Sequence, residues 1–156
     1  MKIEQIEKYI FDDEKFDFIV GDYATYNIYY KIIFEEINLI IGLQTFDHIE
    51  PKIALYKNKI LIGTEDKFSI YELNGKLYKE YEAIVFYDFN INNDKILIMS
   101  ALDFYLLNSD FDIIWHKEFN EMVIDYEIKN SIIIMKDFNG TYIYLDYLTG
   151  KELKNK

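Results

Sequence analysis

Cysteine and arginine are both absent from this sequence of 156 residues, and proline occurs once, at Pro51. Without cysteine, the chain can form neither a disulfide-stapled fold nor a thiolate metal site. Without arginine, it lacks the bidentate guanidinium contacts with which many proteins hold phosphate groups. All 17 basic residues are lysines, and 28 acidic residues give a net charge of −11. Because this charge repels phosphate, we expect no nucleic acid among the direct partners.

Long apolar runs are missing as well. The longest run, at residues 37–43, has the length of a strand, so we expect no membrane-spanning helix and no membrane partner. The first eight residues are charged and contain no apolar core of a secretory signal. Together with the absence of cysteine, these features predict a cytoplasmic protein.

The composition is that of a folded domain with a real core. Hydrophobic residues make up 51% of the chain and aromatic residues 18%, which excludes a disordered acidic tail. No linker rich in proline or serine interrupts the sequence, so we expect a single domain over residues 1–156. Residues 1–13 are predicted to form a short helix, because Ile3, Ile6 and Ile10 recur at helical spacing.

After residue 13, most of the sequence is strand-like and repeats itself. Lys59-Ile60-Leu61-Ile62 recurs as Lys95-Ile96-Leu97-Ile98 and as Ser131-Ile132-Ile133-Ile134, with a spacing of 36 residues both times. A second matched segment follows in each copy, starting at Ile70, Phe104 and Tyr142, and a third starts at Lys79, Lys117 and Lys151. A polar turn precedes each copy, at Lys57-Asn58, Asn92-Asn93-Asp94 and Lys129-Asn130.

Each repeat therefore contains four short strands, which is the size of one propeller blade. Asparagine and aspartate tolerate positive φ angles, so the polar turns favour two-residue hairpins. We expect blade-like repeats at residues 50–82, 83–119 and 120–153, with a degenerate copy at about 16–48. The predicted fold is all-β, with three to four antiparallel four-stranded blade-like repeats in a partial or small propeller-like array. A closed ring and two packed sheets both stay open.

Gly140-Thr141-Tyr142-Ile143-Tyr144-Leu145-Asp146, followed by Thr149-Gly150-Lys151, resembles the blade motif of quinoprotein-type (PQQ-like) β-propeller repeats. Asn74-Gly75-Lys76 and Trp115 echo the same motif in the earlier copies. The resemblance covers roughly residues 50–153 and implies blade architecture only. It does not extend to the quinone cofactor, because the motifs of the far longer quinone enzymes are missing from this sequence.

Residues for catalysis are few. The chain has two histidines, His48 and His116, and serine occurs only at positions 69, 100, 109 and 131. No nucleophile elbow, phosphate loop or zinc-protease motif occurs. We therefore expect no enzyme, no cofactor and no metal site, although Asp137-Phe138-Asn139-Gly140 is a fragment of a calcium loop. A small glycosidase-like hydrolase that uses paired carboxylates is the enzymatic alternative.

The acidic residues recur at equivalent loops of the repeats. The loop between the second and third strands carries acids in each copy, and the loops that join successive repeats carry others. We expect these acids to gather on one rim with exposed aromatic side chains and to bind a partner there. The alternative is that Asp simply favours turns. The predicted partner-binding residues are Asp22, Glu65, Asp66, Glu82, Asp103, Glu121, Asp137, Phe68, Phe104 and Phe138.

These features indicate a non-catalytic, acidic protein-binding module whose partner is a basic protein. The chain is similar to the small, acidic, lysine- and isoleucine-rich immunity proteins of bacteria. That resemblance implies an inhibitor that neutralises a basic toxin, such as a nuclease toxin domain, by direct binding. A propeller-type scaffold or sensor module is the alternative, and the sequence leaves the oligomeric state open.

Overall fold

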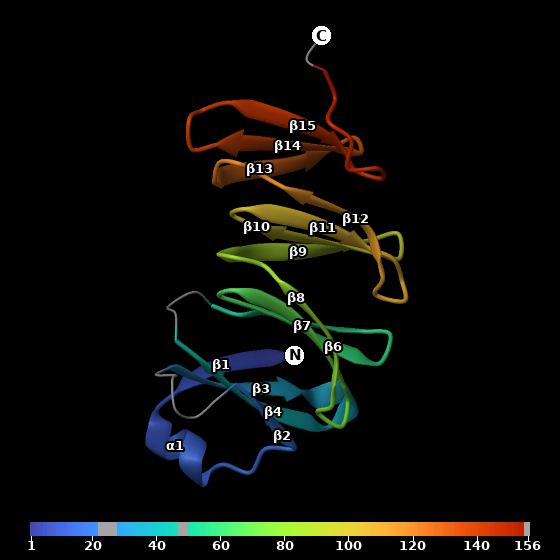
Figure 1. The fold of residues 1–156 in the computed structure, drawn as a ribbon. Helices are drawn as coiled ribbons and strands as arrows, with labels where there is room; N and C mark the ends of the chain where they lie inside the picture. The colour runs from blue at the N-terminus through green and yellow to red at the C-terminus, as the bar shows by residue number, and fades with distance from the viewer. Residues whose placement is uncertain (22–27, 47–49, 155–156) are drawn as a thin grey trace. The chain divides into compact units, whose positions relative to one another are not determined.

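A computed structural model describes residues 1–21, 28–46 and 50–154 of the chain (Figure 1). It contains fifteen named strands in four sheets, which we call sheets A to D. Sheet A contains β1 (Lys2–Ile6), β2 (Phe18–Val20), β3 (Ile28–Phe34) and β4 (Leu39–Thr45). Sheet B contains β5 (Lys52–Tyr56), β6 (Lys59–Thr64), β7 (Lys67–Glu72) and β8 (Leu77–Glu82). Sheet C contains β9 (Phe86–Asn92), β10 (Lys95–Ser100), β11 (Asp103–Leu107) and β12 (Ile113–Glu118). Sheet D contains β13 (Val123–Lys129), β14 (Ile132–Asp137) and β15 (Tyr142–Asp146).

Sheets B, C and D are the three predicted repeats. In each of them, strands that are consecutive in the sequence are hydrogen-bonded neighbours, as in a propeller blade. The fourth strand of sheet D is reduced to an isolated bridge between Leu145 and Glu152. The chain is therefore all-β with propeller-like sheets, and the predicted fold class is confirmed.

The hairpin turns between the first two strands of the repeats have the predicted conformation. Their central residues all have positive φ: 49° and 58° at Lys57 and Asn58, and 47° and 59° at Asn93 and Asp94. Two consecutive left-handed residues are typical of type I′ turns, whose twist matches that of the flanking strands. Each turn therefore fixes the register of its hairpin.

In the third repeat, this register lies one residue away from the predicted alignment. Lys59 and Lys95 each pair with the residue before the turn, but in sheet D that role belongs to Ile132. Ser131 lies in the turn itself, with a φ of 62°. Because side chains alternate between the two faces of a strand, the shift buries Ile133 and leaves Ile134 half-buried.

The predicted helix at residues 1–13 is shorter than expected. Residues Lys2–Ile6 form β1, an edge strand antiparallel to β3, and only Lys8–Asp13 forms a helix, α1. Ile3 packs against the core from β1, whereas Ile10 is 37% exposed. The spacing of three and four residues therefore joins two different elements. No described helix has the length and the apolar character that a membrane span requires.

Sheet A does not repeat the topology of the other three sheets. Its strand order is β1-β3-β4-β2, and β2 runs parallel to β4. In the predicted degenerate copy at residues 16–48, Ile19-Val20 would lie in the second strand of a simple meander. That placement is wrong, because these residues belong to β2, which pairs in parallel with β4 at the edge of the sheet. Helix α1 packs against this sheet through Phe11, which is 1% exposed. Gly42 permits the contact, because a Cβ there would lie 2.9 Å from the rings of Phe11 and Phe16.

Two compact units make up the chain. Unit 1 contains residues 1–65 and 69–80, and unit 2 contains residues 66–68 and 81–156. The prediction of a single domain stays a prediction.

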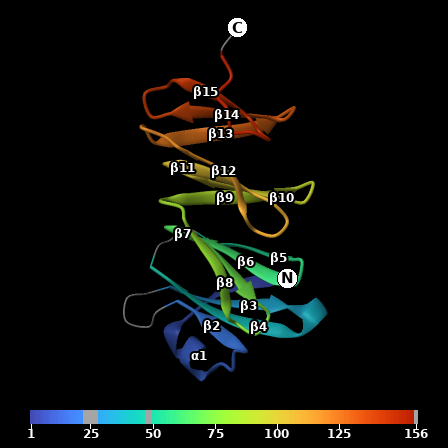
Figure 2. The same ribbon diagram turned by 45° about the vertical axis from the view of Figure 1, so that its right-hand side comes forward.

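In unit 1, apolar side chains of sheets A and B form one core, which includes Ile32, Ile41, Ile60 and Ile62. In unit 2, the core lies between sheets C and D, and Figure 2 shows the strands that contribute to it. That core contains Leu97, Met99, Phe104, Leu106, Trp115, Val123, Ile133, Met135, Leu145 and Tyr147.

The substitution Ile98→Asp tests the placement of β10. The side chain of Ile98 is 0% exposed, so a carboxylate there would be buried without a partner. We expect a loss of at least about 4 kcal/mol in the free energy of unfolding, or no folded protein, measured by urea denaturation. Ile113→Asp is the matched control, because Ile113 is 49% exposed and should cost less than about 1 kcal/mol. Equal stability of the two variants would contradict the register of sheet C.

Candidate functional site

Two sets of loops lie side by side on one rim of unit 2. Backbone hydrogen bonds connect the loops between the second and third strands of each sheet to the loops that join successive sheets. Ala83 N donates to Asp66 O at 2.8 Å, and Val123 N donates to Ala101 O at 2.7 Å. Phe138 N donates to Met122 O, also at 2.8 Å. These bonds bring the predicted acidic loops together on one edge.

A groove opens on this rim between the ends of sheets C and D. It has a volume of about 340 Å³, and we call it the acidic groove. Its lining residues are Lys117, Glu118, Phe119, Asn120, Glu121, Asp137, Thr141, Ile143 and Glu152. The groove thus brings together two predicted site residues, Glu121 and Asp137, with two further carboxylates. Lys117, its one basic lining residue, forms an ion pair of 3.8 Å with Glu152.

An exposed apolar pair lies beside the acidic groove. Phe138 is 72% exposed and Met122 is 43% exposed, and their backbones are joined by the hydrogen bond described above. Met122 directly follows Glu121, which lines the groove. A large aromatic side chain and a flexible thioether next to several carboxylates form a surface of the composition that proteins use for recognition.

Two of the predicted acids are buried and serve the local structure instead. Glu65 is 9% exposed, and its Oε1 accepts a hydrogen bond from Phe46 N at 3.0 Å. Asp137 is 6% exposed, and its Oδ1 accepts a hydrogen bond from Thr141 N at 2.7 Å. Asp137 therefore stabilises its own turn, as the preference of acids for turns had suggested, whereas Glu65 joins the turn after β6 to the residue that follows β4. By contrast, Asp66, Glu82 and Glu121 are exposed to solvent.

Two of the three predicted surface aromatics are buried, so the expectation that they are exposed is wrong. Phe68 and Phe104 are both 0% exposed. The ring of Phe104 packs edge-on against Phe119, with ring centroids 5.3 Å apart, and Phe68 packs edge-on against Phe89 at 5.1 Å. Each residue is the second of its strand and points into the core, so it cannot touch a partner. Phe138 is the one of the three that is exposed.

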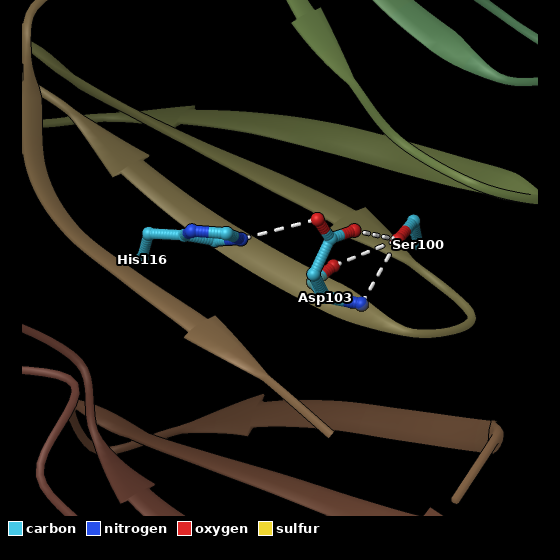
Figure 3. A network of polar contacts seen from close by, with 3 residues as sticks. All are labelled: Ser100, Asp103 and His116. Carbon is cyan, nitrogen blue, oxygen red and sulfur yellow. Dashed lines mark hydrogen bonds and ion pairs between the residues drawn. The ribbon is translucent and has the colours of Figure 1, made fainter. Parts of the chain in front are cut away.

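Asp103 links Ser100 and His116, as Figure 3 shows. The hydroxyl of buried Ser100 donates to the Asp103 carboxylate, and Asp103 N donates to Ser100 Oγ at 3.1 Å. The other carboxylate oxygen lies 3.1 Å from His116 Nε2. The carboxylate therefore accepts the hydrogen bond of the serine hydroxyl and separates the serine from the imidazole. This order differs from that of a serine nucleophile activated by histidine, and it ties β12 to the turn before β11.

A stacked ring supports the same network. The imidazole of His116 lies 4.0 Å from the ring of Tyr105, and the two planes are 4° apart. Burial, together with the negative charge of Asp103, raises the pKa of Tyr105 well above its ordinary value. The tyrosine therefore stays neutral, and its ring provides a flat support for the histidine. We interpret the network as a structural element that holds β12 in place in sheet C.

Two residues considered in the sequence lie outside the described part of the chain, namely Asp22 and His48. Within residues 1–21, 28–46 and 50–154, no group of three or more His, Asp or Glu side chains is placed to hold a metal ion. One carboxylate oxygen of Asp137 accepts a hydrogen bond from Thr141 N, in the hairpin that contains the fragment of a calcium loop.

Glu118, Glu152 and Met122 line or border the acidic groove but were not among the predicted site residues. Glu118 and Glu152 follow the lysines of the third matched segment of their repeats, Lys117-Glu118 and Lys151-Glu152. The repeated Lys-Glu pair was thus a usable signal. Met122 carries no such signal, because a single exposed methionine in a loop has no pattern.

The comparisons with known proteins identify the fold alone. No protein-family model matches the chain, and no curated protein matches it. Among solved structures, the computationally designed Ika8 protein matches with a TM-score of 0.54 and 10% identity, over 87% of this chain and 47% of Ika8. The designed Ika4 protein matches with a TM-score of 0.52 and 12% identity, over 70% of this chain and 74% of Ika4.

A third similar structure is KlHsv2 with loop 6CD replaced by a Gly-Ser linker. Its TM-score is 0.52 and its identity 11%, over 85% of this chain and 50% of that protein. The chain thus spans about half the length of two of these three proteins. At such low identities, the likeness concerns the arrangement of the sheets.

The substitution Asp137→Ala tests whether the Asp137 carboxylate stabilises the fold. It removes the charged acceptor of the Thr141 amide, so we expect a loss of about 1–3 kcal/mol in the free energy of unfolding. Asp66→Ala is the control and should change stability by less than about 0.5 kcal/mol, because Asp66 is exposed. Urea denaturation measures both, and an unchanged Asp137→Ala variant would refute the structural role.

Proposed function

We propose that the chain is a non-catalytic protein-binding module whose acidic groove receives basic side chains of a partner. The observation that carries the proposal is the meeting of three exposed carboxylates, those of Glu118, Glu121 and Glu152, with exposed Phe138 and Met122 on one rim. The groove is large enough for an extended lysine or arginine side chain, and its carboxylates supply complementary charge. A net charge of −11 would steer a basic protein toward this surface from a distance.

The more specific form of the proposal is an immunity protein that neutralises a basic toxin, such as a nuclease toxin domain. A nuclease carries a basic surface because it binds a polyanion, and an acidic groove can compete with nucleic acid for that surface. The partner would then be encoded beside the gene for this chain. This form rests on charge complementarity and on the resemblance in composition to small acidic immunity proteins. A scaffold or sensor that binds another basic protein would use the same groove.

Neutralisation of the groove tests the proposal. In a Glu118→Gln/Glu121→Gln variant, we expect binding of a basic product of a neighbouring gene to weaken at least tenfold, or about 1.4 kcal/mol. The control is Asp110→Asn/Asp112→Asn, which removes the same charge from exposed residues of the loop between β11 and β12, away from the groove. It should weaken binding less than twofold when both are measured by calorimetry in about 150 mM salt.

Equal losses in the two variants would mean that net charge, and not the groove, governs binding. If no basic product of a neighbouring gene binds the chain at all, the immunity form fails. In that case, a titration with an unrelated basic protein would show whether the groove recognises basic side chains in general.

The substitution Phe138→Ala tests the apolar part of the surface. Phe138 is 72% exposed, so its removal should leave the thermal unfolding midpoint unchanged within about 2 °C. Binding should weaken about tenfold or more, mainly through faster dissociation, because an aromatic anchor is lost. Surface plasmon resonance measures both rate constants. A loss confined to the association rate would contradict an anchoring role for the ring.

A further inference from the structure

Among the described residues of unit 2, the outer face of sheet D carries only exposed or half-buried side chains. Ile133, Met135 and Leu145 point into the core between sheets C and D, so the residues that alternate with them lie on the opposite face. The strand register arranges these outer residues in three rows across β13, β14 and β15. The rows are Asp125–Lys136–Tyr142, Glu127–Ile134–Tyr144 and Lys129–Ile132–Asp146.

The equivalent face of sheet C packs against another sheet. There, Leu97, Met99, Phe104 and Leu106 are all 0–1% exposed beneath sheet D. Counted from the hairpin turns and paired in the same register, their counterparts in sheet D are Ile134, Lys136, Tyr142 and Tyr144. The outer face thus keeps the strand register of a sheet-packing surface but carries polar-tipped side chains at three of these four positions.

These side chains suit an interface that can also stand in water. Tyr142 is 52% exposed, and Lys136 Nζ lies 5.8 Å from the centre of its ring. Tyrosine offers a large apolar ring with a polar end, which is why it is enriched at interfaces. Ile134, half-buried between Glu127 and Tyr144, forms the apolar centre of the face.

Two opposite charges on this face, Asp125 and Lys129, are complementary when the same face is turned over. Consider a two-fold axis that lies between two such faces, perpendicular to the strands and above the middle row. It places the first row of one copy opposite the third row of the other. Asp125 then faces Lys129 of the second copy, and Tyr142 faces Asp146, twice each by symmetry. Hydrogen bonds from Thr149 lower the pKa of Asp146, so this carboxylate remains charged at neutral pH.

We propose that the outer face of sheet D binds the same face of a second copy of this chain, and that a two-fold symmetric dimer forms. In this arrangement, Ile134 and Tyr144 meet their own counterparts at the centre. Glu127 also meets its counterpart, which sets two like charges opposite each other at the edge. The dimer leaves the acidic groove outside the contact, because none of the nine outer-face residues lines the groove.

Sedimentation velocity of the 156-residue chain tests the proposal, from about 1 µM to about 500 µM, the range in which a weak specific dimer forms. We expect a concentration-dependent monomer–dimer equilibrium. Lys129→Asp should raise the dissociation constant at least tenfold, because each dimer loses two ion pairs and gains two repulsions. Asp125→Lys combined with Lys129→Asp should restore the constant to within about threefold, because the charges are exchanged. Glu127→Gln should lower it.

Matched controls keep the experiment decisive. Lys57→Asp makes the same charge change at an exposed turn of sheet B and should leave the dissociation constant unchanged. Circular dichroism and thermal unfolding of each variant show that it is folded. A monomer over the whole concentration range would overturn the proposal and leave the face to solvent or to another protein. A dimer that responds equally to Lys57→Asp and Lys129→Asp would overturn it as well, since contact would then lie elsewhere.

Discussion

The packing of apolar sheet faces is the constraint on which the rest of the structure depends. In β10, the four consecutive residues Ile96–Met99 are 0–1% exposed, so sheet C is apolar on both of its faces. A four-stranded sheet of this kind is not stable alone, because it must cover both faces. Sheet D covers one face of sheet C with its own inner face. On the outer face of sheet D, the sequence places Lys136 and tyrosines where sheet C has Met99 and leucine or phenylalanine.

The loops on the rim are free to carry recognition because the sheets supply the stability. In unit 2, backbone hydrogen bonds hold the loops against one another, so the carboxylates of the acidic groove are arranged before a partner arrives. Preorganisation of this kind reduces the entropy lost on binding. The buried acid Asp137 orders its loop, whereas exposed acids such as Glu121 are available to a partner.

The sequence was sufficient to predict the repeats and their hairpin turns, because period-two apolar patterns and Asn-rich turns are local signals. It was insufficient for sheet A, where β2 pairs in parallel with β4 and no local pattern specifies such a partner. Phe68 and Phe104 were misplaced because each is the second residue of a strand that follows a loop, where alternation gives no reference face. Glu118 and Glu152 were missed because the groove exists only after sheets C and D pack.

The central claim is that the acidic groove, and not the acidic surface in general, recognises basic side chains. An NMR titration of the ¹⁵N-labelled chain with an oligolysine peptide tests this claim most directly. We predict that amide shift changes concentrate at residues 117–122, at 137–141 and near Glu152. Shift changes spread evenly over all the exposed acids, including Asp66, Asp110 and Glu127, would contradict it.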